Sequence, residues 1–170
     1  HETVGDSLFE IPGTYPLLPE EVQPRIKLAT DILEDIVGHK VVSWRCPRLF
    51  GGTNVTNALE ALGYECDATY PMYFYNEQLF PYHPSKENWT EQGSLNLIEI
   101  IQFADMRMES KDDYGRDKDQ WPLYRTQSTE AFIPHIESFM SYLEKNDQSQ
   151  KPIVLCFYFH PWEFWEMPEG

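Results

Sequence analysis

Two side chains that could carry out chemistry directly follow apolar stretches of this chain. His160 comes after the run "IVLCFYF" at residues 153–159, and Arg45 comes after "VVSW" at residues 41–44. Aromatic neighbours and the following Pro161 would keep the imidazole partly out of water, where its pKa can lie near neutrality and suit proton transfer. For each residue a purely structural role, as a hydrogen-bonded core histidine or as a salt-bridge partner, is the alternative.

The elements that would position these side chains alternate between helix and strand. Apolar residues at three- and four-residue steps predict helices, and short unbroken apolar runs predict strands. In chain order we expect helix 19–37, strand 41–44, a helix capped at 53 or 54 that ends at 62, strand 64–69, strand 95–103, helix 128–145 and strand 153–159. Continuous rather than alternating apolar strands are typical of a parallel sheet covered by helices. Because the carboxyl ends of parallel strands share one edge, Arg45 and His160 are predicted to converge there.

Three stretches of the chain show no sustained period. Residues 1–19 are expected to form an irregular lead-in, and the charged stretch 105–127 a solvated excursion. Residues 71–93 are rich in Tyr, Phe, Pro and Asn, which predicts a long ordered loop with an aromatic surface.

The size and charge of the chain narrow its class. It has 170 residues, of which 41% are hydrophobic and 15% aromatic, so we expect residues 1–170 to form a single domain with its own core. The 28 acidic and 13 basic residues give a net charge of −15, which opposes binding to nucleic acid or to anionic lipid surfaces. No apolar stretch approaches the roughly 18–20 residues that a membrane span requires.

The three cysteines do not form a metal-binding motif. Cys46, Cys66 and Cys156 are too far apart for a Cys-x-x-Cys pattern, and their odd number leaves at least one unpaired. Cys46 stands beside Arg45 and could be a nucleophile, but no base is paired with it by pattern, so a structural role is favoured.

The segments "GHKVVSWRCP", "NALEALGYECDATYP" and "LCFYFHPWEF" occur in this order along the chain. Together they resemble the polysaccharide deacetylase domain, also known as the NodB-homology domain or carbohydrate esterase family 4. "PYHPS" at 81–85 and "LIEI" at 97–100 are similar to a bacterial branch of that family. The resemblance covers about residues 20–165 and depends on the order and spacing of motifs that are each moderately specific. It implies an α/β fold, a distorted (β/α) barrel of seven or eight strands, whose first strands are absent from this chain.

The resemblance also implies an activity. Members of the family are metal-dependent hydrolases that remove N-acetyl groups from amino-sugar units of a polysaccharide, with a divalent metal, usually zinc, as Lewis acid. On that pattern Arg45 orients the catalytic base and His160 protonates the leaving amine. The residues expected to contact the substrate are Tyr158, Trp162, Pro47 and His83, and the aromatic residues expected to stack on sugar rings are Tyr70, Tyr73, Phe74, Tyr75, Phe80, Tyr82 and Trp89.

The sequence departs from the family pattern at its amino-terminal end. The Asp-Asp motif, which supplies the base and one metal ligand, has no counterpart, and neither does a complete His-x-x-x-His pair. His1 stands about 44 residues before Arg45, near the family's second metal-binding histidine, so it is the predicted metal ligand. We therefore expect a further amino-terminal segment or an oligomer partner to complete the site. Copper binding by His1, as in copper monooxygenases that act on polysaccharides, is disfavoured because those enzymes are antiparallel sandwiches.

Two functions follow from these observations. The first is a zinc-dependent carbohydrate de-N-acetylase, and the alternative is a non-catalytic glycan-binding or structural relative with the same fold. Fold similarity does not distinguish them, whereas metal content and acetate release would. A polysaccharide substrate favours an extracellular or cell-envelope location.

Overall fold

The computed structural model describes most of the chain in several ranges. These are residues 2–4, 7–9, 19–49, 51–72, 75, 77–104, 129–146 and 151–157. The chain divides into two compact units, residues 1–41 and residues 42–170. The single domain expected over residues 1–170 stays a prediction.

The first unit begins with a short hairpin. Strand β1 (Glu2–Val4) pairs antiparallel with β2 (Ser7–Phe9), so that Glu2 lies opposite Phe9. The irregular lead-in expected over residues 1–19 is therefore wrong for these six residues. Three-residue strands lie below the length at which alternation of apolar and polar residues can be recognised in a sequence.

Helix α1 (Pro19–Val37) has the bounds that its apolar repeat predicts. It ends at Gly38, whose φ of 74° is the left-handed conformation that favours glycine, and whose N–H donates to the Glu34 carbonyl at 2.8 Å. Val22 and Ile26 are buried near its start. Burial does not extend to its last turns, where the exposed apolar side chains are Ile32, Leu33, Ile36 and Val37.

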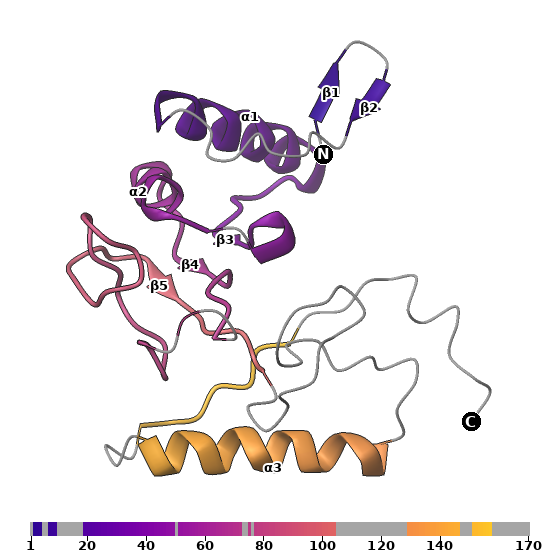
Figure 1. Cartoon of the computed structure of the whole chain (residues 1–170). Helices are drawn as coiled ribbons and strands as arrows, with labels where there is room; N and C mark the ends of the chain where they lie inside the picture. Colours follow the sequence, from indigo (N-terminus) through magenta and orange to yellow (C-terminus); the bar gives the residue numbers. More distant parts are fainter. Residues whose placement is uncertain are drawn as a thin grey trace. The chain divides into compact units, whose positions relative to one another are not determined.

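The second unit is built on a small parallel sheet. Strands β3 (Ser43–Trp44), β4 (Cys66–Asp67) and β5 (Ile98–Glu99) lie side by side in that order, as Figure 1 shows. Both pairings are parallel, and Asp67 lies opposite both Trp44 and Glu99. Each strand lies within a predicted one but is shorter. The described residues form an open sheet of three strands, and the seven- or eight-stranded barrel stays a prediction.

Isolated bridges extend this sheet past the carboxyl end of β5. Gln102 pairs in parallel with Pro71 and also with Cys156, and the Phe103 N–H donates to the Cys156 carbonyl at 2.9 Å. The described part of the predicted last strand, residues 151–157, therefore follows the same direction as β4 and β5.

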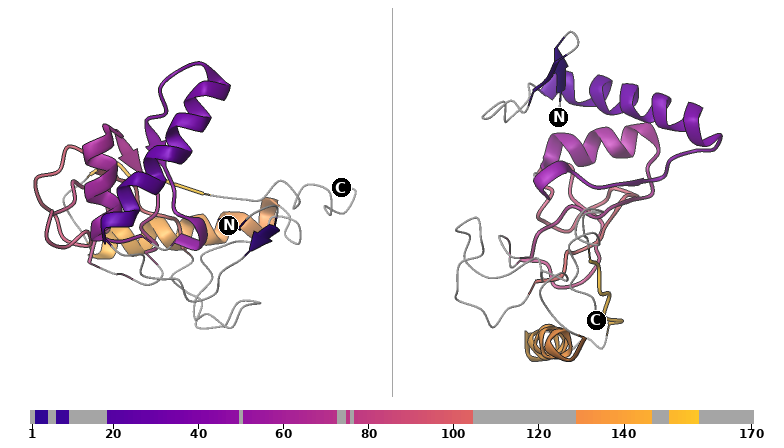
Figure 2. Two further views of the ribbon diagram at one scale, coloured as in Figure 1. Left: turned by 90° about the horizontal axis from the view of Figure 1, so that it is seen from above. Right: turned by 90° about the vertical axis from the view of Figure 1, so that its right-hand side faces the viewer.

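Two helices belong to the second unit. Helix α2 (Thr53–Leu62) follows Gly52 as its N-cap, in place of the expected cap at 53 or 54, and ends at Gly63, whose φ is 77°. Helix α3 (Thr129–Asn146) contains Pro134; Figure 1 shows it along its length as one uninterrupted helix, and the right view of Figure 2 shows it end-on. These bounds lie within one residue of those predicted, because capping and apolar repeats are local signals.

The core of the second unit is largely aromatic. Phe139 and Leu143 of α3 belong to it, together with Phe103 after β5. Phe103 lies 5.0 Å from the Phe139 ring and 4.9 Å from the Phe157 ring, measured between centroids. The other buried members are Tyr70, Met72, Phe80, Tyr82, Trp89 and Ile101.

Gly51 lies against this core and tests its packing. A Cβ atom at Gly51 would lie 2.7 Å from the Trp89 ring and 2.9 Å from the Thr69 methyl, so we expect Gly51→Ala to lower the free energy of unfolding by about 1–3 kcal/mol. Gly52→Ala is the matched control, because its Cβ would meet nothing within 4 Å and its φ of 170° is extended backbone. Urea unfolding of the two variants measures the difference, and equal losses would contradict the packing described.

Candidate active site at the carboxyl edge of the parallel sheet

Arg45 lies at the carboxyl end of β3 and connects three segments of the sheet. Its Nε donates to the Ala68 carbonyl at 2.9 Å, just after β4, and its Nη2 donates to the Cys156 sulfur at 3.2 Å. The residue is exposed. The guanidinium therefore spans from the end of β3 to residue 156, four positions before His160.

Gln102 makes the same two contacts from the other side. Its Nε2 donates to the Ala68 carbonyl at 2.8 Å and to the Cys156 sulfur at 3.1 Å. Arg45 and Gln102 thus both join Ala68 to Cys156, and the four residues form a closed ring of hydrogen bonds. Such a ring fixes the direction in which the Arg45 side chain leaves β3.

A pair of buried acids lies directly beneath this edge. Asp67 of β4 and Glu99 of β5 occupy paired positions, and both side chains are completely buried. Asp67 accepts a short hydrogen bond from the Thr69 hydroxyl through Oδ1. Glu99 accepts the backbone N–H groups of Thr69 at 3.1 Å and Tyr70 at 2.6 Å through Oε1. One oxygen of each acid is thereby bound to the turn that follows β4.

The charge state of this pair departs from that of ordinary carboxylates. Burial raises the pKa of Asp67 to about 7, against the hydrogen bond from Thr69 and the attraction of the Arg45 guanidinium. Burial also raises the pKa of Glu99 well above its ordinary value, and the nearby Asp67 charge raises it further. The two groups titrate together, because the charge on one disfavours charge on the other.

Thr69 connects the acid pair to the residue after Arg45. Its hydroxyl donates to Asp67 and accepts the Cys46 N–H at 2.9 Å. The Cys46 thiol is buried and accepts a hydrogen bond from the Trp44 indole at 3.2 Å. Burial raises the pKa of this thiol to about 12, and the Asp67 charge raises it as well. The structural role expected for Cys46 agrees with this environment, since the thiolate is the nucleophilic form.

Of the other predicted site residues, the structure describes only Pro47 and His83. Pro47 begins the 3₁₀ turn η1 (Pro47–Leu49) directly after Cys46 and is exposed. His83 is also exposed, and its Nδ1 lies 3.1 Å from the Leu97 carbonyl. The remaining four predicted residues lie outside the described residues: His1, Tyr158, His160 and Trp162.

The prediction that the aromatic residues of the loop stack on sugar rings is wrong for most of them. Tyr70, Phe80, Tyr82 and Trp89 are at most 7% exposed and belong to the core, so their ring faces cannot reach a glycan. Their polar groups turn inward as well, since the Tyr82 hydroxyl donates to the Trp89 carbonyl at 2.6 Å. The composition of this loop reflects core packing, because large aromatic side chains can fill a core without regular secondary structure. Tyr75 is partly buried, and Tyr73 and Phe74 lie outside the described residues.

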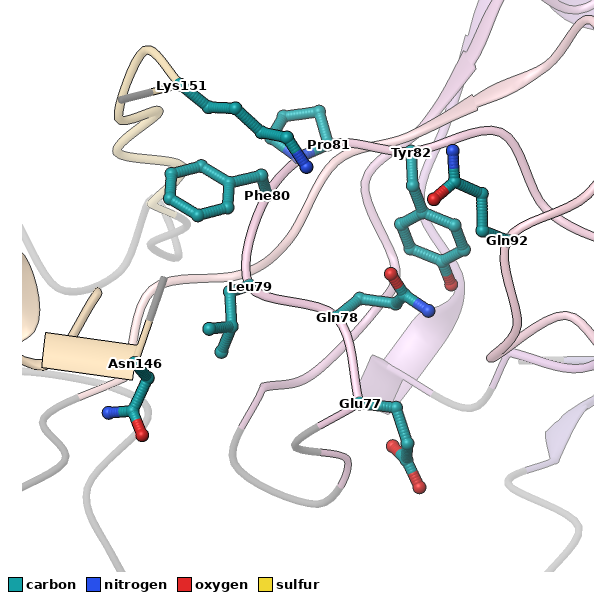
Figure 3. Close-up of a pocket in the computed structure, with 9 residues that line it drawn as sticks. All are labelled: Glu77, Gln78, Leu79, Phe80, Pro81, Tyr82, Gln92, Asn146 and Lys151. Carbon is teal, nitrogen blue, oxygen red and sulfur yellow. The ribbon is translucent and has the colours of Figure 1, made fainter. Parts of the chain in front are cut away.

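A small pocket lies elsewhere on the second unit; of the predicted site residues, only Phe80 and Tyr82 of the aromatic loop line it. Figure 3 shows its wall, in which the Lys151 side chain lies over the Phe80 ring with Nζ 5.5 Å from the centroid. Its volume is about 160 Å³, below the roughly 300–1,000 Å³ usual for small-molecule sites. Gln78 on its wall is already bonded to the Thr90 carbonyl at 2.9 Å. The carboxyl edge with Arg45 is therefore the stronger candidate site.

The described residues do not by themselves supply the expected zinc site. Within these ranges no three His, Cys, Asp or Glu side chains form a group that could hold a metal ion. The acid pair does not form such a site either, since it lacks a third ligand of these types among the described residues. We therefore derive no reaction step through a metal.

No helix in the described part of the chain is long and apolar enough to cross a membrane. Comparisons with protein-family models, curated proteins and solved structures found no significant match.

Sequence reasoning missed the acid pair and the ring around Arg45. Glu99 stands alone among apolar residues in "LIEII", and an isolated acid inside a predicted buried strand is the signal that could have found it. Asp67 gave a weaker signal, because Glu65 stands two positions before it in "YECDATY". Gln102 gave no comparable signal, because a neutral amide in a strand does not distinguish a buried position from an exposed one.

The three free cysteines allow a direct test of the burial described. We expect iodoacetamide at pH 8 to modify Cys156 and Cys66 in the native protein well before Cys46, because Cys46 is buried and its thiol pKa is about 12. Peptide mass spectrometry after timed alkylation measures the order. In denaturant all three should react at similar rates, which serves as the control. Equally fast native modification of Cys46 would contradict the site geometry.

Proposed function

We propose that this chain acts in a carbohydrate de-N-acetylase, a hydrolase that releases acetate from N-acetylated amino-sugar units of a polysaccharide. The observation that carries the proposal is the Arg45 side chain, which extends from the carboxyl end of β3 to residue 156. Active groups of parallel α/β folds gather at this edge. The motif resemblance assigns its chemistry, and the net charge of −15 favours an uncharged glycan over a polyanion.

The reaction assigns separate tasks to the proposed residues. Water adds to the amide carbonyl carbon, the bond between carbon and nitrogen breaks, and the amine leaves with a proton from His160 as general acid. Acetate and the free amino sugar are the products. Arg45 is a positioning residue, since the bonds of its Nε and Nη2 to the protein fix the guanidinium in one orientation, from which it can orient a carboxylate or a developing oxyanion.

The pocket around these groups is completed by other proposed residues. Tyr158 and Trp162 would enclose the acetyl group, and Pro47 and His83 would contact the sugar. The proposal includes a zinc ion with His1 among its ligands, and a further amino-terminal segment or an oligomer partner to complete that site. A substrate of this kind favours an extracellular or cell-envelope location.

Loss of the general acid is the sharpest test of this function. With N-acetylglucosamine oligomers and added Zn²⁺, we expect His160→Ala to lower kcat by about 10²- to 10⁴-fold, measured as acetate release. His39→Ala is the matched control and should keep the rate of the unchanged protein, because His39 is exposed and contacts only the neighbouring Lys40 carbonyl. Circular dichroism of both variants would establish that they fold.

The same assay distinguishes the deacetylase from the alternative function. A non-catalytic glycan-binding relative would bind the oligomers without releasing acetate and without a stoichiometric metal. Acetate release that survives His160→Ala would contradict the role of that residue. Absence of release from the unchanged protein, once the further amino-terminal segment is supplied, would contradict the enzyme.

A further inference from the structure

The acid pair leaves two buried oxygens without an ordinary hydrogen-bond partner. Asp67 Oδ2 and Glu99 Oε2 are both buried and unsatisfied, although the other oxygen of each acid is well bonded. The two carboxyls come from paired positions on neighbouring strands, and each acts on the pKa of the other. Two ionised carboxylates at this separation, both without access to water, would repel each other strongly.

A proton between the two acids resolves both problems at once. One acid then donates to the other, so that each previously unsatisfied oxygen has a partner. The pair carries one negative charge instead of two, and Arg45 is the cation whose field acts on Asp67. Hydrogen bonds between a carboxylic acid and a carboxylate are short and strong.

We propose that Asp67 and Glu99 hold one proton between them at neutral pH, and that this shared-proton pair positions Arg45 and the turn after β4. Neither acid can be a catalytic residue, because both are completely buried and no substrate could touch them. Their effect passes through Thr69, Tyr70 and the Ala68 carbonyl, which Arg45 binds. The proposal does not depend on the proposed deacetylase activity.

The groups that face the pair from neighbouring segments do not titrate in the same range. The Arg45 guanidinium acts on the pair from the end of β3 and lowers the pKa of Asp67. Burial raises the pKa values of the Cys46 and Cys66 thiols and of the Tyr82 phenol, so these groups are neutral around pH 7. Within the described residues, the pair is therefore the group at this edge that changes charge near neutrality.

The pair should make the protein less stable as the pH rises. The folded pair keeps a proton that the unfolded chain has lost above pH about 4–5, where ordinary Asp and Glu ionise. The stabilisation is complete at lower pH and is lost as the pH rises through the raised pKa values of the folded state. Each retained proton changes the unfolding equilibrium constant by about tenfold per pH unit in that window.

Glu99→Gln tests the shared proton directly. The glutamine oxygen can still accept from Thr69 and Tyr70, while its amide N–H replaces the shared proton permanently and donates to Asp67. We measure the unfolding equilibrium constant in urea between pH 5 and 7.5. In the unchanged protein we expect this constant to rise by about tenfold more per pH unit than it does in Glu99→Gln. Glu65→Gln, at an exposed glutamate just before β4, is the matched control and should keep the original dependence.

A second measurement keeps the test independent of folding of the variant. Infrared spectroscopy of the unchanged protein at pH 7 should show the carbonyl band of a protonated carboxylic acid, which ordinary exposed acids lack at this pH. Absence of the band would overturn the proposal, and so would identical pH dependence in Glu99→Gln and the unchanged protein.

A bound cation is the competing occupant of this site. Gln102 Oε1 is also buried and without a hydrogen-bond partner, and carboxylate and amide oxygens are the ligands that Ca²⁺ and Mg²⁺ take. Titration of the metal-free protein with Ca²⁺ or Mg²⁺ distinguishes the two. If the pair shares a proton, the added cation should change the melting temperatures of the unchanged protein and of Glu99→Gln equally. A cation-dependent increase in the unchanged protein alone would overturn the proposal.

Discussion

The interior of the parallel sheet is constrained by two acids that cannot both be ionised. Asp67 and Glu99 occupy paired positions on neighbouring strands, where water cannot solvate them. Their bonded oxygens hold Thr69 and Tyr70, and Thr69 in turn holds the backbone of Cys46. Polar contacts with this pair therefore supplement the backbone hydrogen bonds that join the ends of β3, β4 and β5, in strands that each contain only two residues.

This arrangement explains how so short a sheet can orient an exposed side chain. Two-residue strands supply few ladder hydrogen bonds, so side-chain bonds must set the geometry beyond them. The ring of Arg45, Ala68, Gln102 and Cys156 has this role at the edge. Buried acids that bind backbone N–H groups penalise other conformations of the turn, because any rearrangement would leave a buried charge or donor unpaired.

The extent to which the sequence predicts this structure differs between helices and strands. Helices α1, α2 and α3 agree with their sequence patterns to within a residue, because glycine caps and apolar repeats act over a few neighbouring positions. The predicted strands contain β3, β4 and β5 but are too long, because an apolar run predicts burial and does not show where strand pairing ends. The aromatic loop was misassigned for a similar reason, because the sequence does not show which way an aromatic side chain points. The partner of each buried acid depends on strand register, which no local pattern contains.

Arg45 illustrates how far a site can be inferred before its partners are known. Its position after an apolar strand was enough to predict the edge of the sheet at which it lies, and its contact with Cys156 connects that edge to the segment preceding His160. The guanidinium uses Nε and Nη2 for the protein itself, so its orientation is a property of the fold and does not await a substrate. A side chain that is fixed in this way loses little conformational freedom when it binds a ligand. The buried pair beneath it supplies the counter-charge without competing for the exposed face of the guanidinium, since both acids are shielded from solvent by the turn that they hold.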